Sequence, residues 1–252
     1  NGQLIHPNLA AVTRISDLDN NGVYEYFHDV ITELPGARGP DTLHQNNEIA
    51  FDDEGNLFLA VGSNDDRSLD DHPWGGTILK ATPDFQDIEI IAKGLRNPFG
   101  IAVTKDEEGN DLIYLTDNDV RSNRGDEVNV ARKGSHFGHP FVVGMDKAES
   151  AAENGFDYPI WMGPPNGNLT GIVYLGSQFG ELAGCVLVLD HAEATITLIR
   201  PNSNLGGEVE AKQFMRVSSP IDAVATSSGE VYVLTRDYTR LYRIRPQTEP
   251  GE

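Results

Sequence analysis

Short apolar runs separated by polar, glycine-containing turns recur along this chain. The clearest copies begin at Ile49, Ile101 and Ala223 and read "IAFDDEGNLFLAVG", "IAVTKDEEGNDLIYLTD" and "AVATSSGEVYVLT". Each combines an apolar triplet, a polar turn with Gly and a second apolar run, which predicts two antiparallel strands joined by a tight turn. A weaker copy, "GIVYLGSQFGELAGCVLVLD", starts at Gly171.

The spacing of these copies predicts the architecture. Ile49 and Ile101 lie 52 residues apart, as do Gly171 and Ala223, and weaker apolar runs between the hairpins predict outer strands. A period of roughly 40–50 residues with several strands per unit is typical of a β-propeller. The chain is therefore predicted to be all-β, a single domain over residues 1–252 that forms a six-bladed β-propeller of four-stranded antiparallel blades. Five units are visible, and a sixth would need residues N-terminal to Asn1.

Polar side chains precede two of the predicted inner strands at the same distance. Arg96, in "GLRNPFGIAV", lies five residues before Ile101, and His44, in "HQNNEIAF", lies five residues before Ile49. Loops at equivalent places in neighbouring blades meet at one mouth of a propeller channel. We therefore expect His44, Arg96 and the adjacent Asn97 to line that mouth rather than a core. Alternatively, Arg96 and Asn97 clamp the turn ahead of Pro98.

The amino-acid composition limits the kinds of binding partner that are expected for this chain. The chain has 39 acidic and 19 basic residues, a formal net charge of −20. This excess repels phosphate backbones and anionic lipids, which argues against nucleic acid and membrane surfaces as partners. The one cysteine, Cys185, lies within the apolar "GCVLVLD" and is predicted to be a buried strand residue.

Four segments resemble a known family when taken in order. They are "HQNNEIAFDDEGNLFLAVG", "GLRNPFGIAV", "LTDNDVRSNRGDEVNVARKGSHFGHPF" and "IDAVATSSGEVYVLT". Together they resemble the quinoprotein glucose/sorbosone dehydrogenases, which are six-bladed propellers that use pyrroloquinoline quinone (PQQ) and calcium. The resemblance implies oxidation of a sugar or sugar aldehyde, an electron acceptor such as a cytochrome, and a secreted or periplasmic location.

The resemblance also implies roles for individual residues. His44 matches the general base that takes a proton from the anomeric hydroxyl, a task that suits a neutral imidazole. Arg96 and Asn97 match the pair that contacts the quinone carbonyls, where a guanidinium stabilises the negative charge of reduction. The calcium ligands would be the backbone carbonyls of Asp119 and Val120, with the carboxylates of Asp117 and Asp126 as further oxygen donors.

The chain departs from the family where the cofactor carboxylates would be held. The family has a Lys in the penultimate blade and an Arg-x-Arg before the last inner strand. This chain has Ala192 or Glu193 in place of the Lys, and Ser219 and Ile221 in place of the two Arg. Two other hypotheses therefore stay open: a non-catalytic propeller that binds a carbohydrate or a protein, and a calcium-dependent lactonase-type hydrolase.

Three further polar segments could bind metal, but a structural interpretation is favoured for each. Asp17–Asp29 starts with the spacing of a calcium-binding EF-hand loop, yet His28 stands where such a loop needs Glu. Ser63–His72 is interpreted as a solvated loop, and His136 and His139 as parts of a tight turn.

Overall fold

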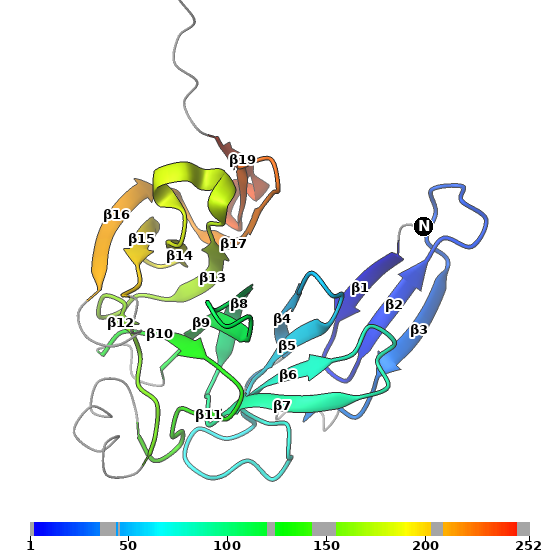
Figure 1. Cartoon of the computed structure of the whole chain (residues 1–252). Coiled ribbons are helices and arrows are strands. Elements are labelled where there is room, and N and C mark those ends of the chain that lie inside the picture. Colours follow the sequence, from blue (N-terminus) through cyan, green and yellow to red (C-terminus); the bar gives the residue numbers. More distant parts are fainter. Residues whose placement is uncertain are drawn as a thin grey trace, which may run out of the picture.

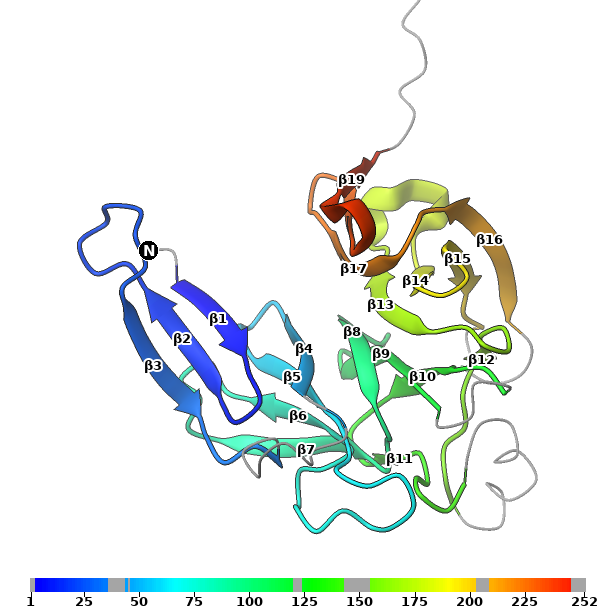
Figure 2. The ribbon, with the colours of Figure 1, turned by 180° about the vertical axis from the view of Figure 1, so that it is seen from behind.

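The computed structural model describes residues 3–35, 44, 46–119, 124–142, 155–202 and 209–245. Within these residues the chain folds into five β-sheets that follow one another in chain order along an arc (Figure 1). The N-terminal and C-terminal sheets stand apart in both views (Figure 2). The all-β propeller architecture is confirmed. The predicted count of six blades is wrong for the described residues, because the five units seen in the sequence form five sheets.

Each sheet is built around strands that follow one another in sequence, with one short strand the exception that joins sheet 2 from farther along the chain. Sheet 1 contains β1 (Gln3–Pro7), β2 (Val12–Ser16) and β3 (Tyr26–Ile31). Sheet 2 contains β4 (Asn46–Phe51), β5 (Leu57–Val61), β6 (Thr77–Ala81) and β7 (Ile88–Lys93), and the short β11 (Ser135–His136) pairs in parallel with β7. Sheet 3 contains β8 (Pro98–Lys105), β9 (Asp111–Asp117), β10 (Glu127–Ala131) and β12 (Trp161–Met162).

The C-terminal half continues the same pattern. Sheet 4 contains β13 (Leu169–Tyr174), β14 (Val186–Asp190), β15 (Thr195–Arg200) and β16 (Glu210–Arg216), and sheet 5 contains β17 (Pro220–Ala225), β18 (Val231–Thr235) and β19 (Leu241–Ile244). Two short 3₁₀ helices, η3 (Ser177–Leu182) and η4 (Asp237–Thr239), interrupt the strands. The weaker hairpin at Gly171 therefore differs from prediction, because η3 rather than a tight turn joins β13 to β14. The four-stranded blade holds for sheets 3 and 4, whereas sheets 1 and 5 have three described strands and sheet 2 has five.

The hydrophobic core lies between successive sheets. Four buried clusters fill the four contacts between neighbours, and the one between sheets 2 and 3 joins Phe58 of β5 to Ile113 of β9. Every residue of β5 is buried because sheets cover both of its faces. Cys185 is fully buried, as the sequence predicted.

The innermost strands share an irregularity near their start. The register with the second strand shifts in each of β4, β8, β13 and β17, between Asn46 and Ile49, Pro98 and Ile101, Leu169 and Ile172, and Pro220 and Asp222. A β-bulge bends a strand and redirects the side chains beside it. The bulges therefore change the direction of the side chains at the starts of these strands, which is the end of the channel where the polar loops lie.

Candidate functional site

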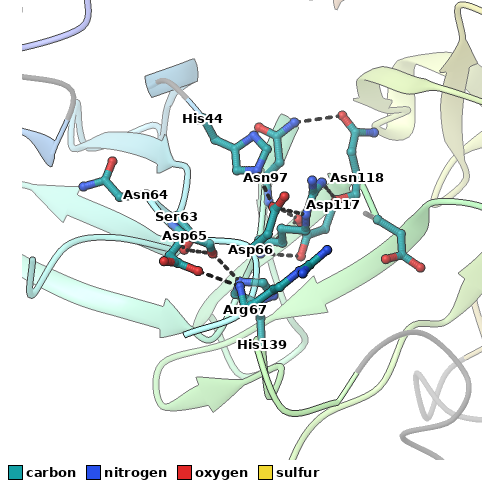
Figure 3. Close-up of polar contacts among 12 residues, drawn as sticks. His44, Ser63, Asn64, Asp65, Asp66, Arg67, Asn97, Asp117, Asn118 and His139 are labelled. Carbon is teal, nitrogen blue, oxygen red and sulfur yellow. Dashed lines mark hydrogen bonds and ion pairs between the residues drawn. The ribbon is translucent and has the colours of Figure 1, made fainter. Parts of the chain in front are cut away.

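Polar side chains from sheets 2 and 3 meet at one end of the channel (Figure 3). His44 and the pair Arg96–Asn97 precede the inner strands β4 and β8, whereas Asp66 and Asn118 follow the second strands β5 and β9. In an antiparallel hairpin the start of one strand and the end of its partner lie at the same edge. The prediction that His44 and Arg96 lie at one mouth agrees with this geometry.

Asp66 connects the two predicted functional side chains. Its Oδ1 lies 3.2 Å from Nε2 of His44 and 2.8 Å from Nε of Arg96. The side chains of His44 and Arg96 are only 11% and 14% exposed, so the pairing is largely shielded from solvent. Burial alone would raise the pKa of Asp66, but the hydrogen bonds from Arg96 and His44 outweigh it and lower that pKa. Asp66 is therefore a carboxylate at neutral pH.

An ionised Asp66 sets the state of the imidazole. A carboxylate can only accept a hydrogen bond, so Nε2 of His44 carries the proton and Nδ1 keeps its lone pair. Burial lowers the pKa of His44, the nearby Arg96 charge lowers it further, and Asp66 opposes both. His44 is consequently neutral at pH 7, with Nδ1 as the atom that can take up a proton.

The loop that carries Arg96 and Asn97 is fixed through its backbone. The buried Asp117 carboxylate accepts hydrogen bonds from the backbone N–H of Arg96 at 3.0 Å and of Asn97 at 2.6 Å. The Arg96 side chain points elsewhere, because Nη1 donates to the Asn118 carbonyl at 2.7 Å. Both sequence interpretations therefore describe part of the loop: its backbone is clamped, and the Arg96 guanidinium lies at the mouth.

Three of the predicted calcium ligands, Asp117, Asp119 and Asp126, lie beside this loop, but among the described residues their carboxylate oxygens do not come together as a metal-binding group. Asp126 accepts hydrogen bonds from the Asn118 side chain and from the backbone N–H of Asp119 and Leu169, at 2.8–2.9 Å. Burial raises the pKa of Asp126 despite these donors. The carboxylates of Asp117 and Asp126 thus already hold N–H groups of the chain. Val120 lies outside the described residues.

Comparison with known proteins decides the family. The sequence model of the family described as Glucose / Sorbosone dehydrogenase matches residues 6–243. The chain belongs to the glucose/sorbosone dehydrogenase family. Aldose sugar dehydrogenase YliI of Escherichia coli (strain K12) is 27% identical over 132 residues, which cover 46% of this chain and 34% of that protein. The chain thus spans about a third of the length of this curated relative.

Solved structures with low identity share the fold. The PQQ-bound form of aldose sugar dehydrogenase from Streptomyces coelicolor superposes with a TM-score of 0.71 at 18% identity, covering 92% of this chain and 71% of that one. The apo form of the soluble Escherichia coli aldose sugar dehydrogenase superposes with a TM-score of 0.61 at 17% identity, covering 94% and 74% of the two chains.

The positions where the family holds the cofactor carboxylates carry no positive charge here. The Ser219 hydroxyl donates to the Asp237 carboxylate at 2.5 Å, so a negative group occupies the neighbourhood of the first missing Arg. Arg216 donates instead to the Glu193 carbonyl, at 3.3 Å on an exposed surface. The propeller fold is therefore kept, with uncharged or acidic residues at the positions that the resemblance assigns to the cofactor carboxylates.

Of the other polar segments, the Asp17–Asp29 turn lies away from the His44–Asp66–Arg96 contact, whereas His139 lies beside it, with Nε2 3.0 Å from the Asp65 carbonyl. One ligand oxygen from each of Asp17, Asp19 and Glu25 lies within 4.8 Å of the others in an exposed turn between β2 and β3, where Asp17 already accepts the N–H of Gly22 at 2.7 Å. The turn interpretation of His136 agrees with its Nδ1, which accepts the N–H of Gly138 at 3.0 Å.

Asp66 is the residue of the candidate site that sequence reasoning missed. It belongs to the acidic loop Ser63–His72, which has four Asp after a predicted strand and was interpreted as a solvated loop. In the structure, Asp70 holds the loop by accepting the N–H of Asn64 at 2.5 Å. Because β4 and β5 are antiparallel, the loop that follows β5 lies at the same edge of the sheet as the residues that precede β4. That shared edge was the signal that could have identified Asp66 as a neighbour of His44.

Across the described residues there is no helix of the length and apolarity that crossing a membrane requires.

Proposed function

We propose that this chain oxidises a sugar or sugar aldehyde at the mouth formed by sheets 2 and 3, with PQQ and calcium as cofactors. The observation that carries the proposal is the contact of His44 and Arg96 with one shared carboxylate, Asp66. Family membership and the PQQ-bound form of a relative with the same fold support the choice of cofactor. An electron acceptor such as a cytochrome, in a secreted or periplasmic setting, completes the proposal.

His44 acts as the general base in this proposal. Nδ1 takes the proton of the anomeric hydroxyl as the C1–H bond breaks, and Asp66 stabilises the imidazolium that forms. PQQ, when bound, supplies the two-electron acceptor for the hydride that leaves the sugar carbon. Arg96 places a positive charge beside the growing negative charge, and Asp66 keeps the guanidinium in position.

The mouth fits the redox end of PQQ better than its carboxylate end. Arg96 and Asn97 offer a guanidinium and an amide to the quinone carbonyls. Calcium would need oxygen donors near Asn118 and Asp119, where the Asn118 carbonyl now accepts from Arg96 and Asp126 accepts the N–H of Asp119. At the other end, Ser219 and Ile221 stand in place of the family's two Arg, and Ser219 is bonded to Asp237. Each lost charge-assisted bond is worth roughly 1.5–3 kcal/mol. We therefore expect PQQ to bind this chain more weakly than it would bind a variant in which the Lys and both Arg were restored.

The same replacement favours one alternative function. A mouth that keeps polar side chains but has lost the anion-holding positions suits a neutral carbohydrate better than a tricarboxylate. The alternative is therefore a propeller that binds a carbohydrate without oxidising it.

Calorimetric titration of the calcium-loaded protein with PQQ tests the proposal. We expect binding tighter than about 1 μM, roughly −8 kcal/mol, and at least tenfold weaker binding by Arg96→Ala. Arg132→Ala is the matched control, because Arg132 is an exposed residue after β10 that does not line the mouth. No detectable heat from PQQ with a folded protein, together with heat from an aldose alone, would contradict oxidation and favour the carbohydrate-binding alternative.

A further inference from the structure

Equivalent positions on the four inner strands form one layer of the central cavity. The aligned triplets start at Ile49, Ile101, Ile172 and Ala223, and the residues just before them are Glu48, Gly100, Gly171 and Asp222. Each lies at the bulge that begins its strand. The layer thus has two glycines in the middle and a carboxyl group at each end.

The glycines allow the strands to approach one another closely. A Cβ on Gly100 would lie 2.6 Å from the Thr170 carbonyl oxygen, and a Cβ on Gly171 would lie 2.9 Å from Cα of Asp222. Contacts this short exclude any side chain at these two positions. β8, β13 and β17 therefore converge in this layer, which brings β17 back toward β4.

The convergence places the two carboxyl groups on the same cavity. Each is near enough to shift the pKa of the other: Asp222 raises the pKa of Glu48, and Glu48 lowers the pKa of Asp222. Each also accepts one backbone bond: Oε2 of Glu48 from Ile101 N–H at 2.8 Å, and Oδ1 of Asp222 from Ala223 N–H at 2.7 Å. Because two ionised carboxylates repel at this range, a hydrogen bond between them needs one proton.

Among the described residues that line the cavity, none is positively charged to relieve that repulsion. The cavity has a volume of about 470 Å³, and fourteen residues of β4, β8, β13 and β17 line it. Only Glu48, Asp222 and Tyr174 among them are ionisable, and β8 contributes apolar side chains alone. Burial raises the pKa of Glu48 well above its usual range, and the Asp222 charge raises it further. Burial also raises the pKa of Asp222, and the hydrogen bond from Ala223 N–H and the neighbouring Glu48 oppose that rise. Asp222 is the more exposed of the two residues.

We propose that Glu48 and Asp222 share one proton across the central cavity, and that this proton makes a pH-sensitive hydrogen bond between sheets 2 and 5. The inner strands β4 and β17 belong to sheets that are not neighbours along the arc (Figures 1 and 2). The shared proton therefore links β4 to β17, which the packing contacts between neighbouring sheets do not join.

The direction of the pH effect follows from the raised pKa values. Between the ordinary glutamate pKa of about 4.5 and the raised value of Glu48, the folded protein binds more protons than the unfolded chain. Stability from the pair is complete below about pH 4.5, and it is lost as the pH rises through the raised value.

Thermal unfolding of Glu48→Gln and wild type between pH 5 and pH 8.5 tests the proposal. The introduced amide would donate to Asp222 without needing a proton, so we expect the variant to match wild type at pH 5 and to exceed its Tm by about 2–4 °C at pH 8.5. Asp53→Asn is the matched control, because it removes one charge from the exposed turn of the same hairpin. This control accounts for the general repulsion of a chain of net charge −20.

A second measurement keeps the proposal testable if the variant unfolds. Carboxyl ¹³C NMR of the wild-type protein should show one Glu resonance, absent from Glu48→Gln, that titrates well above pH 4.5. Titration of that resonance near the ordinary glutamate pKa, or parallel pH profiles of Tm for wild type and Glu48→Gln, would overturn the shared proton.

Discussion

Sheets 2 and 3 carry a network of charged side chains at each end of their strands, and the two networks differ in the ratio of positive to negative groups. At the hairpin-turn end, Asp111 of β9 contacts Lys80 at 2.6 Å and Lys105 at 2.7 Å. Lys105 also lies 3.1 Å from Glu54 and 3.9 Å from Asp52. Two lysines thus meet three carboxylates, and the pKa of Lys105 is raised by Asp111 and Glu54.

At the mouth, a single guanidinium, that of Arg96, lies among several carboxylates, with Arg67 on the exposed side of the same group. Arg96 pairs with Asp66, while the buried Asp117 and Asp126 are satisfied by N–H donors. His44 stays neutral beside them. The turn end therefore fastens two sheets together, whereas the mouth holds a neutral imidazole and a guanidinium on one shared carboxylate. The difference teaches that ion pairing alone does not distinguish the two ends; the imidazole kept neutral beside a fixed carboxylate does.

The largest expected effect is the loss of the base. His44→Gln should lower the rate of aldose oxidation about 10²–10⁴-fold, because general base catalysis contributes that much. PQQ affinity by calorimetry should stay within about threefold of wild type, since Arg96 and Asn97 are kept. A rate within tenfold of wild type would remove His44 from the mechanism.

A smaller and more specific effect is expected from Asp66→Asn. The Asp66 carboxylate raises the pKa of His44, so its removal should shift the acidic limb of the kcat/KM profile to lower pH. The maximal rate should also fall, because an amide no longer fixes the imidazole tautomer. Asp65→Asn is the control for the same loop, and an unchanged limb in Asp66→Asn would show that Asp66 does not position the base.

The clamp of the Arg96 loop should matter for stability. Asp117→Asn leaves backbone N–H groups of the loop poorly satisfied in a buried place, which should cost about 1–3 kcal/mol in urea unfolding. Asp106→Asn is the counterpart in the exposed turn between β8 and β9, where the carboxylate accepts the N–H of Asn110 at 2.8 Å. Equal losses in the two variants would contradict the difference between the ends.

The smallest effect is expected at the turn end. Lys105→Met removes a side chain that is 34% exposed, so its ion pairs are screened and should contribute at most about 1 kcal/mol. That loss should shrink in concentrated salt, and PQQ binding should be unchanged. A larger, salt-independent loss would show that the turn network is as shielded as the mouth.

Local pattern was enough to predict the hairpins and the shared position of His44 and Arg96. The apolar triplets at Ile49 and Ile101 fix which strands are innermost, and antiparallel pairing then fixes which loops meet. The blade count failed because it depends on chain closure, which no local pattern encodes. Asp66 was missed because its partners lie 22 and 30 residues away, in other loops.

The most direct test of the central claim is a dye-linked oxidation assay. Wild type and His44→Gln would be supplied with calcium, PQQ and an aldose, and dye reduction would be followed at pH 7. The account predicts PQQ-dependent turnover by wild type that His44→Gln lowers by at least about 10²-fold. Dye reduction that is absent from wild type under PQQ saturation, or equal in the two proteins, would contradict it.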